Sequence, residues 1–100
     1  MEIKIEKSEN YTVLNLIGRL DTNTAGILEN KLTELFDNNE KFIILNFKNL
    51  DYLSSAGLRV LLAAQKRIKS INGDMILKNV NNDVMEVFSI TGFTEILKIK

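Results

Sequence analysis

The sequence predicts one α/β domain, in which amphipathic helices pack on a mixed β-sheet. Strand-like apolar runs alternate with stretches of helical period along the chain. Strands separated by helices imply right-handed parallel crossovers. The first two runs are instead joined by only three residues, which indicates an antiparallel hairpin. The predicted order is therefore β-β-α-β-α-β-α-β, in a single domain over residues 1–100.

The first two strands are predicted at residues 2–7 and 11–17. In the first, Ile3 and Ile5 alternate with charged residues, as in a half-buried strand. The second is more continuously apolar, so we expect it to lie nearer the centre of the sheet. Residues 18–21 are expected to leave that strand.

A first helix is predicted from about Thr24 to Asp37. Thr22, Asn23 and Thr24 offer cap side chains at its start. Gly26 lies in the first turn, where it costs about 1 kcal/mol relative to Ala, and close packing is the only reason for it that the sequence offers. The apolar face follows the helical period, with Ala25, Leu28, Leu32, Leu35 and Phe36.

Residues 41–47 form the least interrupted apolar run and are predicted to be a strand buried on both faces. The stretch Asp51–Leu62 leads from this strand into a second helix that ends at Ser70. Its apolar face carries Leu58, Leu61, Leu62, Gln65 and Ile68. Asn72-Gly73 then provides a left-handed stop.

The last third of the chain predicts a strand, a helix and a short final strand. The strands are expected at residues 74–78 and 96–99. Gly92 ends the helix, and Phe93 is placed to make the apolar contact that often accompanies such an end. The helix is capped by Asn81, Asn82 or Asp83 and has an apolar face of Val84, Val87, Phe88 and Thr91.

Composition limits the classes of function. The 13 basic and 13 acidic residues cancel, so the chain lacks the basic excess typical of nucleic-acid and membrane surfaces, and we expect neither partner. The N-terminus lacks the pattern of a secretory signal, and no apolar run approaches the roughly 20 residues of a membrane span. A cytoplasmic protein is therefore expected.

The absence of Cys and His limits the chemistry of the chain. Without Cys there are no disulfides and no thiolate metal sites. Without His the commonest general base and the commonest neutral metal ligand are missing, so catalysis would have to use carboxylates, Lys or Tyr.

Two hydroxyls, those of Ser54 and Ser55, lie where the second helix should begin. A helix start leaves backbone N–H groups unpaired, and Ser is a favoured cap there. The same place carries partial positive charge and favours an anion such as phosphate. In α/β sheets, binding sites gather beyond the carboxyl ends of strands. If the strands before Asp21 and Ser55 are parallel neighbours, the two residues lie on the same rim. The residues alone favour a helix cap at Ser55.

Three segments resemble motifs of a known family. The first is Leu53–Leu58, which follows Asn46–Asp51 at the end of the predicted strand. The second is Gly18–Asp21, which is similar to the family's Gly-x-Leu-Asp motif. The third is the pair Asn72-Gly73 before a strand, followed by Val87–Phe93, which is similar to the family's terminal helix and its Gly-aromatic stop. The combination and spacing resemble a STAS domain of the anti-sigma factor antagonist family. The resemblance covers essentially all 100 residues.

The resemblance implies a regulatory interaction protein that is a substrate and a ligand and not an enzyme, with no metal and no cofactor. In such a circuit the unphosphorylated protein binds an anti-sigma factor with serine kinase activity and so releases a sigma factor. The kinase uses ATP to phosphorylate the serine matched by Ser55, which ends binding, and a phosphatase resets it. Many members carry Asp before this serine; here it is Ser54, a second candidate acceptor. The residues expected to contact the partner are Asp21, Thr22, Asn23, Thr24, Ser54, Ala56, Gly57 and Arg59.

Alternatives remain open at this point. The residues Asp21 to Thr24 are also explained as turn and cap residues, and Arg59 as a solvated side chain. The family resemblance also allows a nucleotide-binding STAS module, although the chain lacks a Gly-x-x-x-x-Gly-Lys-Ser/Thr loop. It further allows a STAS subunit of a transporter or a stress-sensing assembly in which the serine is unused.

Overall fold

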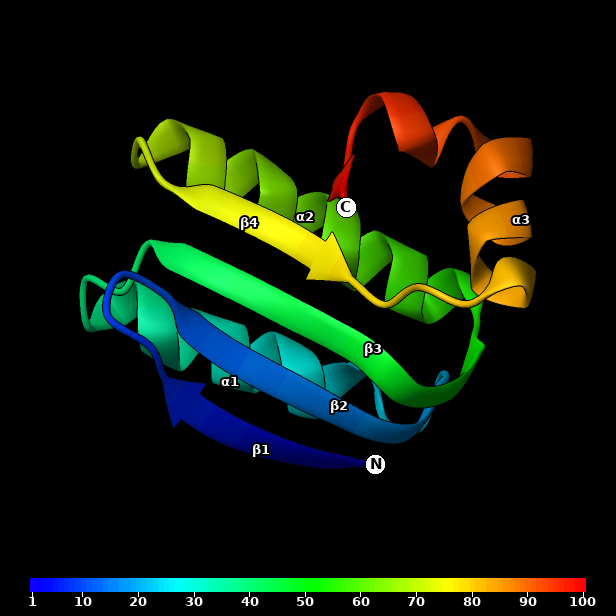
Figure 1. Ribbon diagram of the computed structural model, residues 1–100, viewed down its shortest axis with the longest axis horizontal. Coiled ribbons are helices and arrows are strands. Elements are labelled where there is room, and N and C mark those ends of the chain that lie inside the picture. Colours follow the sequence, from blue (N-terminus) through cyan, green and yellow to red (C-terminus); the bar gives the residue numbers. More distant parts are fainter.

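Five strands form one mixed sheet in the computed structural model, which describes residues 1–100. Their order in space is the same as along the chain (Figure 1). The strands are β1 (Glu2–Lys7), β2 (Thr12–Leu20), β3 (Phe42–Leu53), β4 (Asp74–Lys78) and β5 (Lys98–Ile99). The helices are α1 (Ala25–Asp37), α2 (Ser55–Ser70) and α3 (Asn82–Thr91), and a 3-10 turn spans Phe93–Glu95. The β1–β2 pair is antiparallel and all other pairs are parallel, which confirms the predicted mixed sheet and its element order.

Both long helices cover the same face of the sheet. The sheet grows by one strand in the same direction after each of α1 and α2, so two right-handed crossovers put both helices on one side. In Figure 1 these helices lie behind the sheet, and α3 stands near the carboxyl ends of β3 and β4. The opposite face of the sheet therefore has no helix on it.

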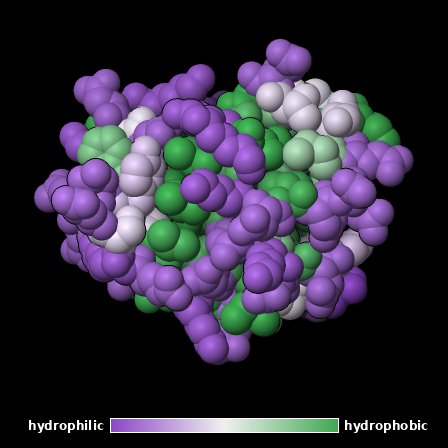
Figure 2. Space-filling model, viewed as in Figure 1, coloured by the Kyte–Doolittle hydropathy of each residue, from purple (hydrophilic) through white to green (hydrophobic).

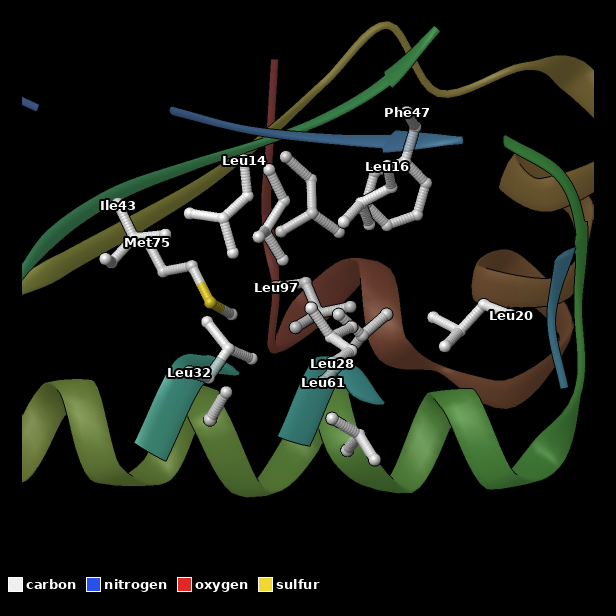
Figure 3. Close-up of a cluster of buried hydrophobic side chains, with 14 of the residues drawn as sticks. Leu14, Leu16, Leu20, Leu28, Leu32, Ile43, Phe47, Leu61, Met75 and Leu97 are labelled. Atoms are coloured by element: carbon white, nitrogen blue, oxygen red, sulfur yellow. The ribbon is translucent and has the colours of Figure 1, made fainter. Parts of the chain in front are cut away.

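The core lies between the sheet and its helices. Figure 3 shows Leu14 and Ile43 of the sheet directed toward Leu32 of α1 and Leu61 of α2, and all four side chains are almost fully buried. The α3 helix joins this core through Phe88, whose ring centroid is 6.3 Å from that of Phe47. Twenty-three buried residues form this one cluster.

The prediction that residues 41–47 are buried on both faces is wrong. In β3, Ile43, Leu45 and Phe47 are buried, whereas Ile44 and Asn46 are only half-buried. The reason is the one-sided placement of the helices, which leaves the other face open. Figure 2 shows this face as a mixture of hydrophobic and hydrophilic residues.

Strands β2 and β3 are longer than predicted. Asn15 pairs with Asn46 and Ile17 with Asn49, so β3 supplies one extra residue to the ladder, and a second shift follows between Gly18 and Arg19. Such bulges break the alternation of a strand. Residues 18–21 therefore do not leave the strand as expected: it continues to Leu20.

The packing reason expected for Gly26 is wrong, whereas the left-handed stop predicted at Asn72-Gly73 is confirmed. A Cβ on Gly26 would meet nothing within 4 Å, so close packing does not explain this residue. The left-handed residue after α2 is Asn72, with φ 60°. Gly73 is needed for space instead, because a Cβ there would lie 2.2 Å from the Lys41 carbonyl oxygen.

The final strand is shorter than predicted. Gly92 ends α3 in the left-handed conformation, with φ 78°, as expected. The chain then turns tightly, and the Leu97 N–H donates to the Phe93 carbonyl at 2.8 Å. This turn occupies the residues before β5, so only Lys98 and Ile99 pair with β4.

Candidate functional site

The candidate site is the rim where β2 and β3 end. Leu20 and Leu53 are paired in the parallel ladder, and the Ser54 N–H donates to the Leu20 carbonyl at 2.9 Å. The loop that begins at Asp21 and the start of α2 therefore meet at one place, as expected for parallel neighbouring strands. We call residues 19–24 and 52–59 the β2–β3 rim.

Ser54, and not Ser55, is the N-cap of α2. Ser54 has extended backbone angles (φ −98°, ψ 174°), and its Oγ accepts a hydrogen bond from the Gly57 N–H at 3.5 Å. The first helical hydrogen bond runs from Leu58 N–H to the Ser54 carbonyl at 3.0 Å. The interpretation of Ser55 as a cap is therefore wrong, because Ser54 already fills that role.

Ser55 is the first residue of α2 and is exposed. Its hydroxyl makes no hydrogen bond within the chain, so it is free to react or to contact another molecule. Because it stands at the N-terminal end of a 16-residue helix, it lies in the positive field of the helix dipole. Arg59 follows one turn later and is also exposed.

Close packing fixes the tip of α2 against the rim. Gly57 is buried, and a Cβ there would lie 2.7 Å from both Leu20 Cγ and Leu53 Cδ1. Ala56 is half-buried beside it. Gly57 therefore positions the helix start that presents Ser55.

The Asp21 carboxylate organises its own loop. Its Oδ1 accepts hydrogen bonds from the backbone N–H groups of Asn23, at 3.0 Å, and Thr24, at 3.2 Å. The Thr24 hydroxyl lies within hydrogen-bonding distance of the same oxygen, at 3.2 Å, and of the Arg19 carbonyl, at 2.7 Å. Thr24 occupies the N-cap of α1 without a side-chain cap bond. Thr22 and Asn23 are exposed on the surface of the loop.

These contacts change the acidity of Asp21. Burial by itself would raise the pKa of this carboxyl, but hydrogen bonds from the Thr24 hydroxyl and from the N–H groups of Asn23 and Thr24 outweigh it, and with the Arg19 charge they lower the pKa. A depressed folded-state pKa gives stability that is present above the unfolded-state value, about 3.9, and is lost as the pH falls through the folded-state value.

This shift predicts a pH-dependent difference in stability. Between about pH 5 and pH 2, the free energy of unfolding of Asp21→Asn should fall less steeply than that of the wild type, since the variant has no carboxylate to protonate. Urea titrations at several pH values measure how steeply the free energy of unfolding changes with pH. The control is Thr22→Ala, which changes an exposed residue of the same loop without removing a carboxylate and should keep the wild-type slope. Equal slopes for wild type and Asp21→Asn would contradict the prediction.

Two residues of the rim were not among the site residues predicted from the sequence. Arg19 and Tyr52 are partners in the β2–β3 ladder, and the Arg19 guanidinium carbon lies 4.2 Å from the centroid of the Tyr52 ring. Arg19 Nε is 3.6 Å from Asp21 Oδ2. Their pairing depends on the register shift after Gly18, which no local sequence signal reveals. We call these two residues the Arg19–Tyr52 stack.

The remaining candidates for a site are a pocket away from the rim, a metal-binding cluster and a membrane-spanning helix. A pocket of about 190 Å³ between α1 and α2 is lined by residues that include Glu29, Phe36, Val60 and Arg67. No group of three or more His, Cys, Asp or Glu side chains is arranged to hold a metal ion. None of the helices has both the length and the hydropathy needed to cross a membrane.

Comparison with known proteins places the chain in a family. BtrV of Bordetella bronchiseptica, provisionally named an anti-sigma factor antagonist, is 33% identical over 99 residues, which are 99% of this chain and 85% of BtrV. The anti-sigma-B factor antagonist of Bacillus subtilis is 28% identical over 99 residues, covering 99% of this chain and 90% of that protein.

Solved structures show the same fold. The anti-sigma factor antagonist SpoIIAA, solved in an unphosphorylated form and in a phosphorylated form from Bacillus, has a TM-score of 0.77 and 23% identity to this chain in both forms. The alignments cover 99% of this chain and 87% and 91% of the respective SpoIIAA chains. The STAS domain family itself matches residues 2–100. On this match, over nearly the whole sequence, the chain belongs to the STAS domain family.

Proposed function

We propose that this protein is an anti-sigma factor antagonist. In its unphosphorylated form it binds an anti-sigma factor with serine kinase activity and thereby releases a sigma factor. Phosphorylation of Ser55 ends the binding, and a phosphatase restores it. In this role the protein is a cytoplasmic ligand and a kinase substrate, and not an enzyme. The names of BtrV and of the Bacillus subtilis antagonist support the role.

The observation that carries the proposal is the free Ser55 hydroxyl at the tip of α2. It is exposed and lies beside the Asp21 loop on the same rim. A partner that covers this rim would meet Asp21, Thr22, Asn23, Thr24, Ala56 and Arg59 around the serine. One docking surface then holds both the contact residues and the residue that is modified.

Phosphorylation at this position changes the surface and leaves the fold intact. A phosphoserine carries about −1.5 to −2 charges, and the N-terminal end of a helix favours negative charge. The added charge and bulk therefore act on the docking partner, as in other local switches. A phosphorylated form has been solved for SpoIIAA, which has the same fold.

Ser54 is a poorer site of phosphorylation than Ser55. It is half-buried, and its Oγ already accepts the cap bond from Gly57. A phosphate on Ser54 would have to replace this cap beside the closely packed Gly57. Ser55 has no such bond to lose.

The proposal predicts one site of modification. After incubation with the anti-sigma factor kinase of the same organism and Mg-ATP, peptide mass spectrometry should find phosphate on Ser55. Ser54→Ala should still be phosphorylated while losing about 1 kcal/mol of stability with its cap, and Ser55→Ala should keep its stability and remain unmodified. Phosphate on Ser54 alone, or on neither residue, would contradict the proposed switch.

A further inference from the structure

We propose that the Arg19–Tyr52 stack is a receptor for a carboxylate side chain on the bound protein partner. The inference rests on the proposed function, because that partner is the anti-sigma factor. It adds to it the chemistry of one contact: an Asp or Glu of the partner meets the Arg19 guanidinium.

The position of the guanidinium is fixed from two sides. Tyr52 lies beneath it at 4.2 Å, in the arrangement of a cation–π contact. Asp21 lies at its edge, with 3.6 Å between Oδ2 and Nε, and Asp21 is itself held by the N–H groups of its loop. The strands also fix the backbone positions of both residues, since Arg19 and Tyr52 are paired in the β2–β3 ladder.

The donors of Arg19 remain available to another molecule. The guanidinium carries five N–H donors in a planar fork, and no hydrogen bond within the chain uses any of them; its one ion pair faces Nε. The Arg19 side chain is 60% exposed, and the Tyr52 residue is 42% exposed. The free end of the fork matches the two oxygens of a carboxylate, which it can bind with two parallel hydrogen bonds.

The stack also has the character of a binding hot spot. Tyr and Arg are enriched among the few residues that dominate interface energies. A side chain that is already held in place loses little conformational entropy when a partner binds. The Asp21 charge beside Arg19 favours a singly charged carboxylate over a dianionic phosphate, because it offsets part of the positive potential.

This contact would lie on the same rim as the Ser55 switch. Ser54 is hydrogen-bonded to Leu20, the residue after Arg19, so Ser55 and Arg19 lie on the same short rim. A phosphate on Ser55 adds negative charge to the rim that would receive the partner's carboxylate, which disfavours that carboxylate's approach. The receptor therefore gives phosphorylation an electrostatic means of releasing the partner.

The test is the affinity of the purified anti-sigma factor for full-length variants, measured by titration calorimetry. Arg19→Glu should weaken binding by about 100-fold or more. Arg19→Lys, which keeps the charge and loses the fork, should weaken it by about 10-fold, as should Tyr52→Ala, which frees the guanidinium. The matched control is Lys66→Glu, on the exposed side of α2, with wild-type affinity expected. Arg19→Lys serves as the decisive variant if Arg19→Glu loses its cooperative melt.

A charge exchange identifies the group that Arg19 meets. Each Asp and Glu on the partner surface is replaced by Arg in turn, and one such variant should restore the binding of Arg19→Glu. If the Arg19 variants bind and are phosphorylated like the wild type, or if no partner substitution restores binding, the inference is overturned while the proposed function stands. If the wild-type protein does not bind the anti-sigma factor at all, both are overturned.

Discussion

Replacing Ser55 by Asp is expected to weaken binding to the anti-sigma factor by about 100-fold or more, while the thermal unfolding stays cooperative. The new carboxylate stands at the exposed first residue of α2, where a partner docked on the rim must exclude water from it. The same charge interacts favourably with the helix dipole, by about 0.3–1 kcal/mol. Titration calorimetry measures the first effect, and circular dichroism melts measure the second.

Two control variants test whether the effect requires a negative charge and whether the charge must lie on the rim. Ser55→Ala removes the hydroxyl without adding charge and should bind like the wild type. Ser8→Asp adds the same charge in the exposed β1–β2 turn, at the opposite end of β2 from the rim, and should also bind normally. If Ser55→Asp binds as tightly as the wild type, the switch lies elsewhere.

Replacing Gly73 by Ala is expected to cost about 3 kcal/mol of stability, at the upper end of the usual range for overpacking. The added Cβ would lie 2.2 Å from the Lys41 carbonyl oxygen. This oxygen cannot withdraw freely, because it accepts the Asp74 N–H at 2.8 Å where β4 begins beside β3. The clash is therefore with backbone, at the entry to the parallel ladder. Urea denaturation should show a lower midpoint with an unchanged m-value.

The same substitution at Gly26 is the matched control, with the opposite sign. A Cβ there meets no atom within 4 Å, and Ala is a better helix former than Gly by up to about 1 kcal/mol. Gly26→Ala should therefore raise the free energy of unfolding by about 0.5–1 kcal/mol. A stabilised Gly73→Ala, or a strongly destabilised Gly26→Ala, would contradict the packing argument at that site.

The sequence by itself determined the kinds and order of the elements. Hydrophobic period, cap residues and the left-handed Gly92 are local signals, and each depends on residues only a few positions apart. The parallel connections followed from helices between strands, and they correctly placed the Asp21 loop beside the start of α2. The presence of a hydroxyl at the tip of α2 could also be read from the sequence.

Only the tertiary structure decided the details that make the rim a candidate site. The choice of Ser54 as the cap, the bulges that extend β2 and β3, and the stacking of Arg19 on Tyr52 all depend on the pairing of strands about thirty residues apart. The open face of the sheet likewise follows from the order in which strands are added. Register and layer order arise from long-range contacts that must be satisfied together, and no short window of sequence contains them.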